Sequence, residues 1–220
     1  MVKRFFTLLI CLCFVTQSFS QDKEHLPRFS IRAYCDIPKI IGSEAFRESF
    51  LGVYDAGINF NLRLFSNFTF GIGYQNALFN QTTFFKYKGL DTRMQVHDGV
   101  IRIGYDKSTG PKSFISISLS SGYGVNQYTA VKAAKDSLNG KFPTFFNSAF
   151  IRPEFSANFL VEDNFAFGVH IAYNMSLSTY DPKLDCFNTY VDFAQWRNRA
   201  NMGWISFGFG FYYGAKKKKA

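Results

Sequence analysis

The chain has 220 residues, of which 19% are aromatic and 28 are phenylalanine, yet its mean hydropathy is −0.08. Many aromatic residues at a nearly neutral mean hydropathy disfavour an ordinary soluble enzyme. They favour a protein whose apolar residues are spread along alternating strands. The formal charge of +9 would ordinarily suggest a nucleic-acid-binding protein. Because no base-stacking motif accompanies it, lipid phosphate is the more natural anionic partner.

The N-terminal segment has the pattern of a cleaved export signal. Lys3 and Arg4 precede an apolar run, Phe5 to Val15, that is too short to span a bilayer as a helix. Ser18-Phe19-Ser20 then supplies small residues at the two positions that a signal peptidase reads. We expect residues 1–20 to be removed, which lowers the charge from +9 to +7. An uncleaved N-terminal membrane anchor is the alternative.

Period-two alternation of apolar and polar side chains predicts eight strands in the mature chain. In chain order they cover residues 29–35, 51–64, 68–78, 94–105, 114–126, 149–160, 165–177 and 205–214. The second strand alternates most cleanly. The fourth is irregular around Asp98-Gly99, which a β-bulge would explain, and Pro153 weakens the sixth.

The last strand, Ile205 to Gly214, indicates which solvent the outer face meets. One face carries only large apolar residues, and the other carries Ser206, Gly208, Gly210 and Tyr212. The second face has too little bulk to be a protein core, so we expect the aromatic face to contact lipid.

The predicted connections alternate in length. Short turns fall at 65–67, 106–112 and 161–164, and longer polar loops at 36–50, 79–93, 128–148 and 178–200. Short periplasmic turns and long external loops are typical of outer-membrane barrels. The sequence therefore predicts an all-β fold, an eight-stranded antiparallel up-and-down transmembrane β-barrel over 21–214, followed by a basic tail at 215–220. Both mature termini are expected in the periplasm.

The run Ser206-Phe207-Gly208-Phe209-Gly210-Phe211-Tyr212-Tyr213 matches the pattern polar-x-Gly-x-x-aromatic-x-aromatic. From Phe29 to Gly214 the chain resembles the small eight-stranded bacterial outer-membrane barrel families, such as the membrane domain of OmpA and OmpX, and its composition is similar to that of Bacteroidetes exported proteins. The resemblance implies a porin-like protein of the Gram-negative cell envelope. It also implies an insertion signal, formed by Ser206, Gly208, Phe211 and Tyr213, that the barrel-assembly machinery reads. The tail after Gly214 departs from the many members that stop at the final aromatic residue.

Several charged residues share the predicted inward face. An eight-stranded barrel is just wide enough for its own side chains, and buried charges must be paired. We therefore expect a charge network that fills the lumen, with a small polar pore as the alternative; its members are Arg32, Asp55, Arg63, Arg102, Arg152, Glu154 and His170. Because bases outnumber acids, loop carboxylates or bound anions are expected to supply the balance. Six aromatic residues near strand ends are assigned to the membrane interfaces: Tyr34, Tyr54, Tyr74, Tyr105, Tyr123 and Trp204.

Other reactive residues give weaker signals. Cys35 and Cys186 remain after signal removal, and an oxidising compartment favours one disulfide, which would tie the first strand to the last long loop. Two unpaired thiols are an equal alternative, because a sequence does not give their separation. His170 lacks a serine at a distance that could share its proton, and no cysteine–histidine spacing fits a metal, so no catalytic residue, metal or cofactor is predicted.

These observations predict a non-enzymatic integral outer-membrane barrel with a structural or loop-mediated binding role. The expected partners are outer-membrane lipids, lipopolysaccharide and, during insertion, the barrel-assembly machinery; no nucleic acid is expected. A barrel-embedded lipid-modifying enzyme, such as a lipid A deacylase, and a soluble lipocalin-like carrier are the alternatives. A part in a secretion apparatus has no specific support in the residues.

Overall fold

A computed structural model describes residues 26–65, 67–82, 91–132, 143–181 and 201–215. Within these ranges the chain forms eight strands and one short helix. They are β1 (Phe29–Ile40), α2 (Glu44–Ser49), β2 (Phe50–Phe65), β3 (Phe68–Gln81), β4 (Asp91–Gly110), β5 (Ser113–Lys132), β6 (Thr144–Glu162), β7 (Phe165–Thr179) and β8 (Asn201–Ala215). No helix in the described ranges is long and apolar enough to cross a membrane.

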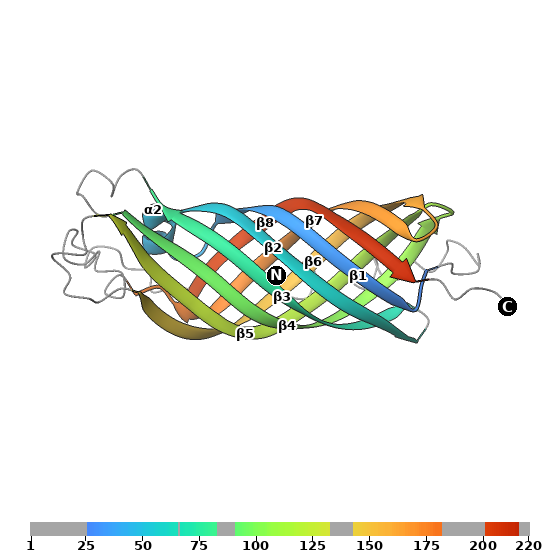
Figure 1. Ribbon diagram of the computed structural model, residues 1–220, viewed down its shortest axis with the longest axis horizontal. Coiled ribbons are helices and arrows are strands. Elements are labelled where there is room, and N and C mark those ends of the chain that lie inside the picture. Colours follow the sequence, from blue (N-terminus) through green and yellow to red (C-terminus); the bar gives the residue numbers. More distant parts are fainter. Residues whose placement is uncertain (1–25, 66, 83–90, 133–142, 182–200, 216–220) are drawn as a thin grey trace, which may run out of the picture.

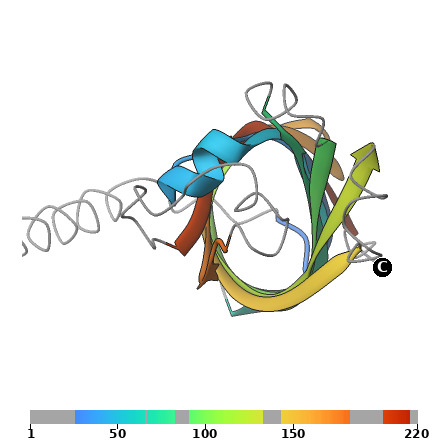
Figure 2. The same ribbon diagram turned by 90° about the vertical axis from the view of Figure 1, so that its left-hand side faces the viewer.

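The strands form one closed antiparallel barrel in which each pairs with its neighbours in sequence. The barrel closes where β1 pairs with β8, from Phe29 opposite Ala215 to Ile40 opposite Trp204. Viewed along its axis, the sheet is a complete ring with α2 at its rim (Figure 2). The eight-stranded up-and-down β-barrel predicted from the alternation is confirmed.

The two ends of the barrel differ. At one end, called here the short-turn end, brief connections join β2 to β3, β4 to β5 and β6 to β7. At the other, the loop end, α2 lies between β1 and β2 (Figure 1). β1 begins and β8 ends at the short-turn end.

Most strands run further toward the loop end than the sequence predicted. β1 continues to Ile40 rather than ending at Cys35, and part of the predicted first loop is the helix α2. At the short-turn end, β4 reaches Gly110, so the predicted turn at 106–112 shrinks to the two residues between Gly110 and Ser113.

The outer wall carries the apolar belt that the alternation predicted. Phe60, Ile72 and Phe209 point outward and are 52%, 59% and 51% exposed. Inward neighbours on the same strands, such as Asn59 and Asn61, are buried. A membrane-spanning strand needs only about 9–11 residues, so strands of up to 20 residues extend past this belt.

Toward the loop end of β4 the polarity of its two faces reverses. On β4, Met94 and Val96 face inward and are buried, while the alternating positions Gln95 and His97 face outward. This reversal explains the irregular alternation in the fourth strand. No bulge lies at Asp98-Gly99, where the register runs unbroken through both neighbouring strands.

Two interface assignments are wrong. Trp204 faces inward and is 2% exposed, in the apolar cluster at the loop end. Tyr34 also faces the lumen, where its ring packs against Arg152.

Pro153 does not interrupt the sixth strand. It faces outward within a continuous β6, but the β6–β7 ladder has no pairs between Ile151 and Glu154. A proline lacks the N–H that this ladder needs.

The reversal predicts that a charge on the outer wall has opposite consequences at two heights. Ile103→Arg, in the apolar belt of β4, should lower the free energy of unfolding by about 2–4 kcal/mol, because the guanidinium would enter hydrocarbon. Gln95→Arg, outward on the same strand toward the loop end, should cost about 0–1 kcal/mol. Equilibrium unfolding in phospholipid vesicles measures both. Equal costs would contradict the placement of the belt.

Candidate functional site

The lumen is the candidate functional site, because every strand contributes inward side chains to it. Its middle is polar and charged, and an apolar cluster lies at each end. The closed eight-stranded ring leaves space for little beyond these side chains.

Arg152 lies at the centre of the polar layer. Its Nη1 donates to Asp55 Oδ2 at 3.1 Å, and its Nη2 donates to Asp36 Oδ2 at 3.2 Å. The guanidinium also lies over the Tyr34 ring, 4.2 Å from the ring centroid. One buried cation therefore joins β6 to β1 and β2 across the lumen.

Asp55 is the main acceptor of this layer and is 0% exposed. Besides Arg152, four side chains from β3, β7 and β8 donate to its two oxygens at 2.5 to 3.2 Å: Gln75, Asn174, Trp204 and Ser206. These donors replace the hydrogen bonds to water that the Asp55 carboxylate loses when it is buried.

A second cluster, centred on Asp106, lies nearer the short-turn end. Arg32 Nη2 donates to both of its oxygens, at 2.7 and 2.6 Å, and Arg63 Nη2 lies 3.6 Å from Oδ2. Arg102 connects the two clusters. Its Nη2 donates to the Ser116 hydroxyl, to which Arg32 Nη1 also donates, and it lies 3.5 Å from Glu154. Glu154 is in turn 3.6 Å from Arg152.

All seven residues assigned to the lumen network face inward and belong to these connected clusters. Sequence reasoning missed Asp36 and Asp106, because it assigned both to connections. Each continues the inward alternation of its strand: Asp36 follows Arg32, and Asp106 follows Arg102 at the same spacing. With them the excess of bases disappears, and strand carboxylates rather than loops or bound anions supply the balance.

Asp98 also faces inward and is 2% exposed. Among the described residues, its Oδ1 has no hydrogen-bond partner, and neither has Oε1 of Gln75, which is opposite it in the register.

His170 contacts Asp36, with 2.7 Å between Nε2 and Oδ2, and its ring meets Tyr34 edge-on. In the described part of the chain, no serine hydroxyl forms a hydrogen bond with this imidazole. A polar cavity of about 30 Å³ lies beside it, lined among others by Arg32 and Glu154. That volume suits about one water molecule rather than a substrate.

Each end of the polar layer is covered by apolar side chains. At the loop end, Phe46 of α2 is 0% exposed and packs with Phe50, Phe79 and Tyr180. At the short-turn end, Phe114 packs edge-on against Tyr212, and Arg32 lies over the Tyr212 ring. We call these two groups the loop-end cap and the short-turn cap.

The residues of the expected insertion signal divide between the two faces of β8. Phe211 and Tyr213 point outward and are 51% and 53% exposed. Ser206 and Gly208 point into the lumen, where Ser206 is hydrogen bonded to Asp55. A Cβ on Gly208 would lie 2.3 Å from the backbone oxygen of Cys35, so this glycine is also required for close packing of β8 on β1.

Cys35 lies on the outward face of β1 and is exposed. It is in mid-strand, opposite Ala56 and Phe209, rather than at the loop end. Cys186 lies outside the described residues, so the disulfide stays a prediction. The described ranges contain no group of three or more His, Cys, Asp or Glu side chains that could hold a metal ion.

No protein-family model and no curated protein matches the chain. Solved structures do match. Neisserial surface protein A shares 13% identity at a TM-score of 0.53, covering 87% of this chain and 100% of its own. Ail of Yersinia pestis, solved with the heparin analogue sucrose octasulfate, shares 8% at 0.44 (84% and 97% covered). The outer membrane protease OmpT of Escherichia coli shares 9% at 0.38 (86% and 94%).

The first of these likenesses shows a shared fold: the chain is built like the small outer-membrane β-barrels. At such low identity it shows nothing finer. A shared fold does not by itself decide activity.

The Asp106 cluster predicts a large effect from a small change. Asp106→Asn leaves Arg32 and Arg63 facing each other without their carboxylate, so we expect a loss of about 3–5 kcal/mol of unfolding free energy. The exposed carboxylate of Glu162 provides the matched control, and Glu162→Gln should change stability by less than about 0.5 kcal/mol. Unfolding in detergent micelles compares the two, and similar losses would remove the case for a buried ion cluster.

Gly208 and Gly99 form a second matched pair. Gly208→Ala should cost about 1–3 kcal/mol, because the added methyl meets the β1 backbone. At Gly99 the nearest atom to an added Cβ is 3.8 Å away, so Gly99→Ala should be nearly neutral. Refolding of purified chains without any assembly factor separates this packing effect from loss of an insertion signal. A Gly208→Ala chain as stable as the parent would contradict the close approach.

Proposed function

We propose that this chain is an integral protein of the bacterial outer membrane, without enzymatic activity, whose barrel is a closed scaffold for binding at its loop end. Residues 1–20 would be removed as a signal peptide, and the barrel of residues 21–214 would insert with the short-turn end and both mature termini in the periplasm. The short tail, 215–220, would lie on the periplasmic side. Lipopolysaccharide would surround the loop end, after insertion by the barrel-assembly machinery.

The observation that carries the proposal is the filled lumen. The charged layer is paired internally, and the loop-end and short-turn caps cover it on both sides. A conducting pore would need a continuous water path, and a lipocalin-like carrier would need an interior cavity larger than the 30 Å³ polar cavity beside His170. The apolar outer wall further disfavours the soluble carrier, because wide apolar surface on a soluble monomer is unusual.

A lipid-modifying enzyme is the rival function. It needs a nucleophile beside a general base, and His170 is instead bonded to Asp36 inside the lumen, away from the outer wall. Loss of an acyl chain from lipopolysaccharide after incubation with the purified protein, read by mass spectrometry, would establish the rival and contradict the proposal.

Closure of the lumen can be tested by thiol labelling. In a chain with Cys35→Ser and Cys186→Ser, Ser120→Cys places a thiol in the buried layer beside Arg152, and Thr129→Cys places one on the exposed outer wall toward the loop end. A membrane-impermeant maleimide should label the second thiol and leave the first unlabelled in the folded protein. Both should react after denaturation.

The parent protein in planar bilayers supplies the independent measurement. We expect no large, stable conductance, because the paired charges and the two caps obstruct the lumen. Rapid labelling of Ser120→Cys together with a steady open level would show a water-filled pore and overturn the closed scaffold.

A further inference from the structure

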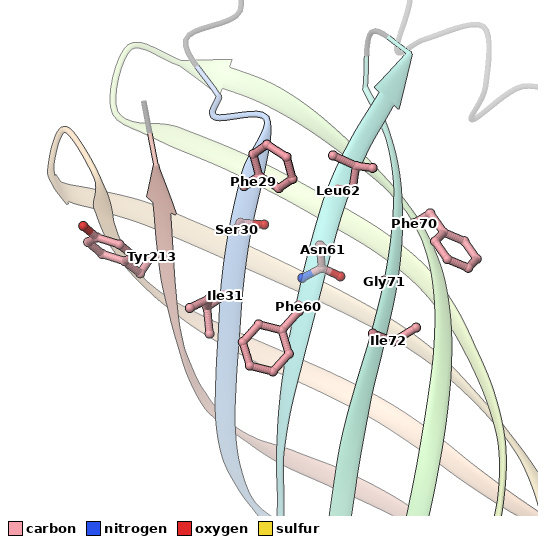
Figure 3. A pocket seen from close by; sticks show the side chains of 10 residues that line it. All are labelled: Phe29, Ser30, Ile31, Phe60, Asn61, Leu62, Phe70, Gly71, Ile72 and Tyr213. Atoms are coloured by element: carbon pink, nitrogen blue, oxygen red, sulfur yellow. The ribbon is translucent and has the colours of Figure 1, made fainter. Parts of the chain in front are cut away.

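The outer wall carries a groove near the short-turn end, across β8, β1, β2 and β3 (Figure 3). Its volume is about 510 Å³, and its walls are outward side chains such as Phe29, Phe60 and Phe70. Between these walls the side chains of Ser30 and Asn61 point inward, so the backbone forms the floor. The lining is apolar and lies within the belt, so hydrocarbon around the barrel fills the groove without a specific partner.

The lumen, in contrast, contains two buried acceptors without a donor. Asp98 of β4 and Gln75 of β3 lie opposite each other in the strand register, and both are buried. Within the described ranges, neither Asp98 Oδ1 nor Gln75 Oε1 has a hydrogen-bond partner. A buried acceptor left without a donor costs free energy, so these two oxygens indicate that a donor lies between them.

The Gln75 amide cannot turn to supply this donor. Its Nε2 donates to Asp55 Oδ1 and to Asn174 Oδ1, each at 3.0 Å. Exchanging the amide nitrogen and oxygen would place Oε1 against these two acceptors and break both bonds. Gln75 Oε1 therefore stays an acceptor.

The described strands beside Asp98 present no cation to it. β3 presents the Gln75 amide, and β5 presents Gly124, which has no side chain. The charged group that acts on Asp98 is the Asp55 carboxylate of β2, which repels a second negative charge. An ionised Asp98 would therefore be a buried charge without a counter-ion in the described part of the barrel.

The charges of the lumen balance when one carboxyl group is neutral. In the described strands the inward charged groups are the arginines Arg32, Arg63, Arg102 and Arg152 and the carboxyl groups of Asp36, Asp55, Asp98, Asp106 and Glu154. Each arginine is paired with a carboxylate other than Asp98. His170 can donate Nε2–H to Asp36 as a neutral imidazole, so it need not carry the balancing proton.

We propose that Asp98 is a neutral carboxylic acid in the folded barrel and that its O–H donates to Gln75 Oε1. One proton then satisfies the glutamine oxygen and removes the buried charge that no cation pairs. A bridging water could donate to both oxygens, but it would leave the charge in place.

This proton lies beneath the loop-end cap. The next inward residues on the same strands, Ala77 of β3 and Val96 of β4, belong to the apolar cluster that includes the cap. Loss of the proton would place an unpaired charge against this cluster, and water would have to enter to solvate it. The loop end is therefore sealed while Asp98 is neutral and loosened in alkaline medium.

Infrared spectroscopy of the folded mature protein tests the proton directly, because a protonated carboxyl group absorbs apart from a carboxylate. At about pH 6, where exposed carboxyl groups are ionised, the parent should show a protonated-carboxyl band. Asp98→Asn should lack the band, and Glu162→Gln, which changes an exposed carboxylate, should retain it. A parent without the band, or a band that survives in Asp98→Asn, would overturn the proposal.

Stability against pH gives an independent measurement. The unfolded chain releases the Asp98 proton at about pH 4, whereas the folded barrel keeps it to higher pH, so the stability of the parent should fall as the pH rises over this interval. Asp98→Asn supplies an N–H in place of the O–H. It should unfold at the same or a higher urea concentration than the parent, with a margin that grows with pH. Asp106→Asn, which removes a paired carboxylate, should be less stable throughout. Equal losses in the two variants would show that Asp98 is ionised.

Trp204 reports whether the loop end loosens, because it is buried in the same apolar cluster. The chain has two tryptophans, so Trp196→Phe leaves Trp204 as the only one. In that background, raising the pH from about 6 to about 9 should shift the emission to longer wavelength as Asp98 ionises. Adding Asp98→Asn should abolish the shift. An equal shift in both chains, or none in the parent, would contradict the link between this proton and the cap.

Discussion

Closure of the sheet is the constraint on which the rest of the structure depends. In hydrocarbon every backbone N–H and C=O must be bonded within the protein, and the β1–β8 ladder closes the eight described strands into a ring. Eight strands close around a narrow lumen, so inward side chains from opposite walls must meet. The buried arginines therefore reach carboxylates on distant strands, as Arg152 reaches Asp55 and Asp36, and close packing of β8 on β1 requires a glycine at 208.

The two faces of β4 exchange polarity along its length. Within the belt, β4 sets Ile101 and Ile103 outward and Arg102 inward, whereas toward the loop end it sets Met94 and Val96 inward. The loop-end part of the barrel is therefore organised like a water-soluble protein, with Phe46 of α2 sealing an apolar core. The charged layer and the apolar caps together fill the lumen with side chains. A filled lumen agrees with the proposed scaffold, whose contacts with other molecules would lie on its outer wall and loops.

The sequence predicted the candidate site only in part. Alternation gave the inward face of all seven network residues, because strand geometry forces period two. It did not give their partners, because Asp36 and Asp106 lay in stretches that no longer looked like membrane strands. It also placed Trp204 at an interface, since a tryptophan near a strand end fits either a membrane boundary or an apolar cap. Pairing across the lumen joins Arg32 to Asp106 and Arg152 to Asp36, which are 74 and 116 positions apart, and no local pattern encodes that.

The sequence by itself determined the strand number, the antiparallel order and the apolar belt, because these follow from local alternation and from the length of each connection. Only the tertiary structure decided which charges meet, where the strands end and how the outer wall is shaped. Those features depend on the register between strands: a shift of one residue would turn every side chain to the other face. The groove that Phe29 and Phe60 line exists for the same reason, since the register between strands decides which outward side chains lie side by side.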